Sequence, residues 1–103
     1  MRTPTYFILA SLLDGRRHGY EIIKQASRLS GGRVRLAAGT LYGALERLLG
    51  AGLIEVVGEE IVGGRARRYY ALTDRGRGEL RDEAERLSQA SLAVLGPAVG
   101  EPA

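Results

Sequence analysis

The apolar residues of this chain change their spacing halfway along the sequence and change it back further on. Residues 53–57 and 67–72 are rich in β-forming side chains and predict two strands. Between them, residues 58–66 predict a hairpin tip, because the adjacent Gly63 and Gly64 suit the positive φ angles of a tight turn. On both sides of the hairpin, apolar residues recur every three to four positions, as in helices. Helices before and after a single hairpin restrict the chain to a small set of folds.

Three helices are predicted before the hairpin. Residues 4–13 are apolar nearly all round, which indicates a helix buried on two sides. After a polar turn at 14–19, residues 20–29 predict a second helix, and residues 38–48 a third that ends at the following glycines. The third helix has an apolar face of Leu41, Ala44, Leu45 and Leu48 and an opposite face of Gly39, Thr40, Gly43, Glu46, Arg47 and Gly50. Because glycine inside a helix costs about 1 kcal/mol relative to alanine, the second face suits either an ordinary surface helix or close approach to DNA.

One long helix is predicted after the hairpin, with Thr73 as its N-cap and Gly96-Pro97 at its end. Its apolar seam recurs at steps of three and four residues and consists of Leu80, Ala84, Leu87, Ser91 and Val94. A chain of 103 residues that uses its front helices for one core leaves such a seam uncovered. The seam therefore predicts a homodimer, to which Phe7 of the first helix adds, unless the seam folds back on its own domain.

The expected fold is mainly α with a small β-hairpin, that is, a winged helix-turn-helix plus a long C-terminal dimerisation helix. Residues 1–73 are expected to form the winged helix-turn-helix DNA-binding domain, residues 74–96 the dimerisation helix, and residues 97–103 a flexible tail. In such a fold the N-terminal part of the third helix enters the major groove, and an arginine-bearing wing follows the backbone or the minor groove.

The residues expected to contact DNA lie in three of these elements. They are Gly39, Thr40, Tyr42, Gly43 and Arg47 in the third helix, Arg65 and Arg67 on the hairpin, and Tyr20 and Lys24 in the second helix. A half-buried core tyrosine is the alternative for Tyr42, and solvated charge is the alternative for the arginines. The roles of Arg16, Arg17 and Arg68 stay open.

Charge favours a nucleic-acid partner. Residues 1–54 carry eight basic and three acidic side chains, whereas residues 79–103 carry two basic and five acidic ones. This distribution fits nucleic acid on one side of the molecule and self-association or solvent on the other. Fourteen of the fifteen basic residues are arginine, which suits phosphate recognition but also follows from GC-rich codon usage.

Catalysis, metal binding and membrane association find no support in the sequence. There is no cysteine, and the single histidine, His18, lacks clustered carboxylates, so we expect it to make a turn or capping contact before the second helix and expect no metal. No serine has a histidine and acid to activate it, so neither an enzyme nor a cofactor is expected. Without a spanning apolar run or a cleavable leader, the expected location is cytoplasmic, with no membrane partner.

Five short motifs in order carry a family resemblance. They are Gly19-Tyr20-Glu21-Ile22, Gly39-Thr40-Leu41-Tyr42, Leu45-x-x-Leu48, Gly52-Leu53-Ile54 and Tyr69-Tyr70-x-Leu72-Thr73. Over residues 4–82 the chain resembles the PadR family of bacterial transcriptional regulators, of the short type with a single C-terminal helix. The resemblance implies a homodimer that binds a palindromic operator in double-stranded DNA, usually represses, and is often released by a small-molecule effector.

The chain departs from the family pattern around the third helix. Ala37 and Ala38 stand where Ser-Pro is usual, and Gly43 replaces a proline. The N-cap of the helix therefore lacks a side chain that can accept a capping hydrogen bond. Some short members bind flat aromatic drugs between tryptophans, a mode not carried over because this chain has no tryptophan. The candidate effector pocket here is built from Tyr6, Phe7, Leu87 and Ser91. The alternative function is a winged-helix protein–protein interaction module without sequence-specific DNA binding, against which the basic front half counts.

Overall fold

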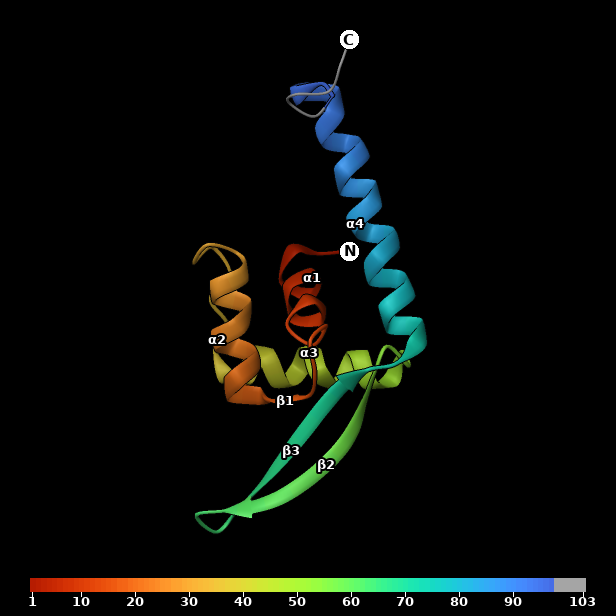
Figure 1. Ribbon diagram of the computed structural model, residues 1–103. Coiled ribbons are helices and arrows are strands. Elements are labelled where there is room, and N and C mark those ends of the chain that lie inside the picture. The colour runs from red at the N-terminus through yellow and green to blue at the C-terminus, as the bar shows by residue number, and fades with distance from the viewer. Residues whose placement is uncertain (98–103) are drawn as a thin grey trace.

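The computed structural model describes residues 1–97, which form four helices and one three-stranded antiparallel sheet (Figure 1). The helices are α1 (Thr3–Ala10), α2 (Gly19–Leu29), α3 (Ala38–Gly50) and α4 (Asp74–Leu95), and the strands are β1 (Arg17–His18), β2 (Ile54–Val62) and β3 (Arg65–Leu72). This order confirms the predicted winged helix-turn-helix followed by a long helix. Apart from Pro97, the predicted tail 97–103 lies outside the described residues.

The sheet contains a strand that the sequence did not predict. β3 lies in the middle, with β2 on one side and β1 on the other. The short strand β1 pairs Arg17 with Tyr70 and His18 with Tyr69, so the prediction of a turn over 14–19 was wrong at its end. A two-residue strand is too short to show the alternation that marks longer strands. Its pairing ties the start of α2 to the hairpin.

The hairpin strands are longer, and its tip is shorter, than predicted. β2 and β3 pair up to Val62 and Arg65, so the turn consists of Gly63 and Gly64 alone. These glycines have φ angles of +59° and +78°, the combination that matches the twist of a two-residue hairpin. The predicted nine-residue tip at 58–66 was wrong because backbone pairing continues through exposed residues, the apolar Ile61 and Val62 among them, which show no alternation of buried and exposed side chains.

The hydrophobic core lies where α1, α2, α3, the base of the hairpin and the start of α4 meet. Its buried members are Ile8, Leu9, Leu12, Ile22, Leu41, Ala44, Leu45, Leu48, Leu53, Ile54, Tyr70, Leu72 and Leu80. The predicted apolar face of α3 is buried in full. α1 ends at Ala10 and not at the predicted Leu13, because the amides of Leu12 and Leu13 bond to carbonyls only three residues back.

The N-terminus of α4 is fixed against both the end of α3 and the start of β2. Thr73 caps α4 as predicted: its Oγ1 accepts a hydrogen bond from the amide of Gly76 at 3.0 Å. The same hydroxyl donates to the carbonyl of Gly52 at 2.7 Å, and the Thr73 amide donates to the carbonyl of Leu53 at 3.1 Å. Gly76 packs directly on Leu53, where a Cβ would overlap the carbonyl group. A glycine is therefore required at this position.

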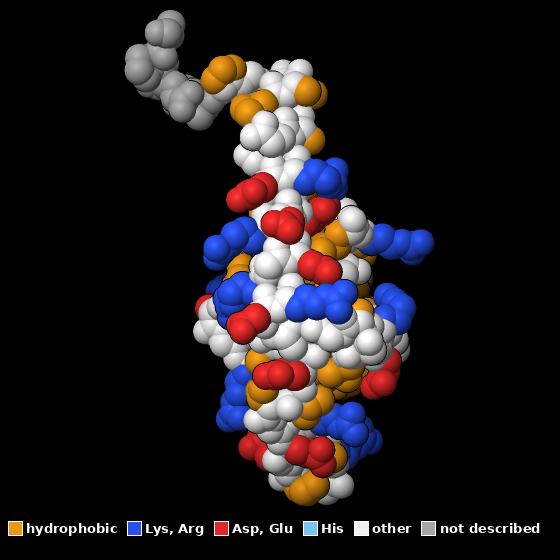
Figure 2. All heavy atoms as spheres, turned by 90° about the vertical axis from the view of Figure 1, so that its right-hand side faces the viewer, with side chains coloured by type: hydrophobic (Ala, Val, Ile, Leu, Met, Phe, Trp, Pro, Cys, Tyr) orange, Lys and Arg blue, Asp and Glu red, His pale blue; other side chains and the backbone are white. Residues whose placement is uncertain are grey.

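Most of α4 projects away from the rest of the chain (Figure 1). Leu80 is 3% exposed and packs in the core of its own chain, so it is not on the free part of the predicted seam. Beyond it, Leu87 is 42% exposed and Val94 85% exposed. Figure 2 shows apolar side chains gathered at the far end of α4, above a zone of acidic and basic ones. The Cα radius of gyration is 15.7 Å, whereas a compact domain of about 100 residues has about 13 Å.

Candidate nucleic-acid interface

A cleft of about 480 Å³ separates the N-terminal half of α3 from the hairpin. Its lining consists of His18, Gly19, Tyr20, Tyr42, Glu46, Val62, Arg65, Ala66, Arg67, Arg68 and Tyr70. Four predicted DNA-binding residues from three different elements thus meet at one concavity. The sequence reasoning missed His18, Glu46 and Tyr70 and left Arg68 open, because only the return of β3 beside α3 brings them here. For Tyr70, the one signal in the sequence was its place two residues before Leu72 on a predicted strand, which puts both side chains on the same face of the sheet.

The N-terminal part of α3 presents open backbone to solvent. Its N-cap is Ala37, which makes no side-chain capping bond, as predicted, so the first-turn amide groups keep their donor capacity. Thr40 and Gly43 are exposed, and no atom lies within 4 Å of where a Cβ on Gly39 would be. Packing within the described chain therefore does not require glycine at this position. The positive end of the helix dipole is exposed at the same place.

Two tyrosines form the wall of the cleft between α2 and α3. Tyr42 is 52% exposed, and its hydroxyl lies 2.9 Å from where a Cβ on Gly19 would be. Its ring therefore leans on the first residue of α2 while one side stays open. Tyr20 is 66% exposed, with Lys24 Nζ 5.4 Å from its ring centroid, within the range of a cation–π contact.

The arginines near the hairpin differ in how far they are neutralised. Arg67 Nη1 lies 3.7 Å from Glu60 Oε1, and Arg68 Nε lies 3.7 Å from Glu59 Oε2. Within residues 1–97, Arg65 beside the turn forms no ion pair. Exposed pairs of this kind are worth at most about 1 kcal/mol, so phosphate can displace either carboxylate. Arg65 is the cation that is immediately available at the tip.

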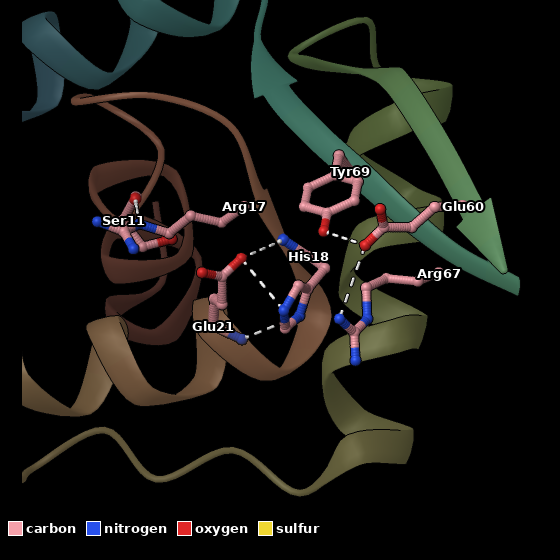
Figure 3. A network of polar contacts seen from close by, with 7 residues as sticks. All are labelled: Ser11, Arg17, His18, Glu21, Glu60, Arg67 and Tyr69. Atoms are coloured by element: carbon pink, nitrogen blue, oxygen red, sulfur yellow. Dashed lines mark hydrogen bonds and ion pairs between the residues drawn. The ribbon is translucent and has the colours of Figure 1, made fainter. Parts of the chain in front are cut away.

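Two groups of polar contacts, one at the start of α2 and one on the hairpin, meet where the His18 ring lies against Tyr69 (Figure 3). His18 caps α2, as predicted: the amide of Glu21 donates to His18 Nδ1 at 3.4 Å, and the His18 amide donates to Glu21 Oε1 at 3.2 Å. The His18 ring lies edge-on to Tyr69, with 5.6 Å between centroids. The hydrogen bond that Tyr69 donates to Glu60 raises the pKa of the phenol, which stays protonated. These contacts hold the hairpin against α2.

Two arginines that the sequence left open have partners within the domain. Arg17 Nε donates to the carbonyl of Ser11 at 2.7 Å, and its Nη2 lies 3.1 Å from the carboxylate of Asp14. The guanidinium of Arg16 lies 4.6 Å from the centroid of the Tyr69 ring. Both side chains therefore brace the sheet.

The described residues contain no cluster of three or more potential metal ligands. Within the same residues, no helix is both long and apolar enough to cross a membrane.

A helix-turn-helix with an open second helix, followed by a two-stranded wing with arginine beside its tip, defines a winged helix-turn-helix protein. Residues 8–82 match the sequence pattern of the "Transcriptional regulator PadR-like family". The chain belongs to this family of transcriptional regulators.

Relatives of known sequence or structure agree with this assignment. A transcriptional regulator of Mycobacterium tuberculosis is 37% identical over 89 residues, which cover 86% of this chain and 79% of the relative. Bacillus subtilis PadR in complex with operator DNA is 30% identical with a TM-score of 0.71, covering 81% of this chain and 48% of that chain. A PadR family regulator from Clostridium difficile is 28% identical with a TM-score of 0.71, covering 89% and 96%. The chain thus spans about half of the Bacillus subtilis protein.

Proposed function

We propose that the protein is a homodimeric repressor that binds an inverted-repeat operator in double-stranded DNA. Residues 1–73 bind DNA, and residues 74–96 join the protomers. The observation that carries the proposal is the cleft, where the exposed Tyr42 and Glu46 of α3 face the arginine-bearing wing. Support also comes from the likeness to Bacillus subtilis PadR, whose structure was determined with operator DNA.

The exposed residues of α3 and the wing take different roles in this proposal. Thr40 and Arg47 are both exposed on α3 and read base edges in the major groove, where a good contact is worth about 1–3 kcal/mol. Gly39 and Gly43 let the helix approach the DNA closely, and its free amides favour a phosphate. Arg65, which is unpaired within residues 1–97, contacts phosphate or the minor groove.

The dimer forms through the free part of α4. Its exposed seam consists of Leu87, Ser91 and Val94, with the half-buried Ala84 beside them. A projecting helix with apolar side chains at its far end matches the surface that a two-fold partner covers. Phe7 of α1 adds to this interface through its place beside Leu87.

A small-molecule effector fits between α1 and α4. Tyr6, Phe7 and Leu87, three of the four residues predicted for a pocket, line a hollow of about 300 Å³, and Ser91 does not. Glu83 and Arg86 supply polar groups at its wall. A ligand here touches the helix that joins the protomers and so can change the spacing of the two DNA-reading surfaces.

Selection of bound duplexes from a random DNA pool tests the DNA-binding proposal. We expect a palindromic motif, with binding that weakens steeply as salt rises. Arg65→Ala should weaken binding to all sequences and flatten the salt dependence, whereas Thr40→Ala and Arg47→Ala should change the preferred motif. Arg81→Ala is the control, because Arg81 is an exposed arginine on α4, away from the cleft.

Equal loss on every sequence for the Arg65, Thr40 and Arg47 variants would contradict the assignment of reading and positioning roles. Failure of a folded, dimeric protein to enrich any motif would favour the alternative, a winged helix that binds another protein.

A further inference from the structure

A second basic surface lies on α2 and the segment that follows it. It consists of Lys24, Arg28, Arg33 and Arg35, and we name it the α2 basic surface. All four side chains are exposed, and none forms an ion pair within residues 1–97. Between Glu21 and Glu46 the sequence contains no acidic residue at all. The four basic side chains therefore have no acidic residue among them within this stretch, and such a cluster favours an anionic partner.

The α2 basic surface is hollowed. A depression of about 490 Å³ has Lys24, Arg28 and Arg35 around it, and the rest of its lining is Tyr20, Ile23, Ser27 and Leu36. Arg35 Nε donates to the carbonyl of Gly32 at 3.1 Å, which orients its guanidinium group while the residue stays exposed. Arg28 lies in the last turn of α2, where a cation is favourable beside the helix C-terminus, but this reason does not apply to Lys24 or Arg35. Three cations around one hollow suit an anion held between them.

The α2 basic surface is continuous with the proposed DNA-binding cleft. Tyr20 lines both hollows. The segment 33–37 leads directly into α3 and carries the basic residues to the N-terminus of that helix. In Figure 1, α2 lies on the opposite side of α1 from α4. If α4 is at the two-fold axis, the α2 basic surface faces away from the axis.

We propose that the α2 basic surface binds DNA phosphates beyond the outer end of each half-site. This inference rests on the proposed function. Contacts of this kind position the protein and add affinity without reading sequence. None of the four basic residues lines the cleft, but Lys24 is already among the expected DNA contacts, so Arg28 and Arg35 are the residues of the depression that test this surface alone. The operator is then contacted over a length greater than its palindromic sequence.

Binding to two duplexes of different length tests the inference. The short duplex ends at the last base pair of the selected motif, and the long one extends about half a helical turn (~5 base pairs) further on each side. Wild-type protein should bind the long duplex more tightly and with a steeper salt dependence. The double variant Arg28→Gln, Arg35→Gln should lose this difference. Four fewer phosphate contacts per dimer lower the slope of log K against log salt by about 3.6, at about 0.9 for each phosphate.

Two controls separate this effect from charge and folding. The double variant Arg77→Gln, Arg81→Gln removes the same charge from exposed positions on α4 and should keep the advantage of the long duplex. The variant Arg28→Lys, Arg35→Lys keeps the charge and should keep most of that advantage. Circular dichroism melting of each variant shows whether the fold is retained.

Two results would overturn the inference while leaving the proposed function intact. One is equal wild-type affinity for the two duplexes, and the other is an equal loss on both duplexes for the Gln double variant. Failure of the wild type to bind even the short duplex would instead refute the proposed function itself.

Discussion

Replacing Gly76 with alanine should destabilise the protein strongly, although alanine favours helices. In the structure, a Cβ on Gly76 would lie 2.8 Å from the carbonyl carbon of Leu53 and closer still to its oxygen. The neighbouring atoms are backbone, so the N-terminus of α4 must move. That movement breaks or stretches the hydrogen bonds that Thr73 makes with Gly52 and with Gly76 itself.

The size of the Gly76→Ala effect follows from three contributions. Overpacking at a closely packed site costs about 1–3 kcal/mol. Loss of two hydrogen bonds adds about 2 kcal/mol. The better helix propensity of alanine offsets at most about 1 kcal/mol. The free energy of unfolding should therefore fall by about 2–4 kcal/mol, which lowers the Tm by at least about 8 °C in a domain of this size.

Urea unfolding of Gly76→Ala and Gly78→Ala at one fixed protein concentration tests this reasoning. Gly78 lies two residues further along the same helix, is exposed, and has no atom within 4 Å of where its Cβ would be. Its replacement should raise stability by up to about 1 kcal/mol. If both variants shift the midpoint in the same direction and by a similar amount, the close approach of Gly76 to Leu53 does not control stability.

Three further changes have defined outcomes. His18→Ala removes the cap of α2 and should cost about 0.5–2 kcal/mol in urea unfolding, whereas His18→Asn, which keeps an acceptor, should cost less; equal losses would exclude a capping role. The hydrogen bond from Arg86 holds the pKa of Glu83 below its usual value. The ion pair between Glu83 and Arg86 therefore stabilises the fold at neutral pH, and this stabilisation is lost as the pH falls below about 4.3, the ordinary pKa of a glutamate. In Glu83→Gln, the free energy of unfolding should accordingly fall less between neutral and acid pH than in the wild type. An unchanged fall would count against the pairing of Glu83 with Arg86. Val94→Asp should shift sedimentation from dimer to monomer, whereas Ala93→Asp, which places the same charge on α4 about 100° away and off the seam, should not; two monomeric variants would argue against the seam.

The sequence predicted those elements whose side chains carry a repeating pattern or a specific local bond. The four apolar positions of α3 are buried as their spacing required, and Thr73 and His18 both cap the helices they precede. These features depend on residues within a few positions of one another. A short stretch of sequence is therefore enough to predict them.

What the sequence did not predict depends on contacts between distant segments. β1 exists because Arg17 and His18 lie beside β3, and neither residue has strand character of its own. Leu80 continues the spacing of the seam, yet it packs in its own core because the first turns of α4 lie against the rest of the domain. The cleft likewise needs β3 to return beside α3, which brings Tyr70 and Arg68 next to Tyr42.

The direct connection between β3 and α4 makes the last helix a mechanical lever. Thr73 is the single residue between Leu72 and Asp74, and its bonds to Gly52 and Leu53 leave no flexible joint there. The 22 residues of α4 span about 33 Å at ~1.5 Å per residue. A tilt of α4 by about 10° together with the segment that holds its start therefore displaces the far end by roughly 6 Å, comparable to one helical turn. In a dimer joined through α4, sub-ångström shifts near Gly76 would be magnified into a change of register between the two DNA-reading surfaces.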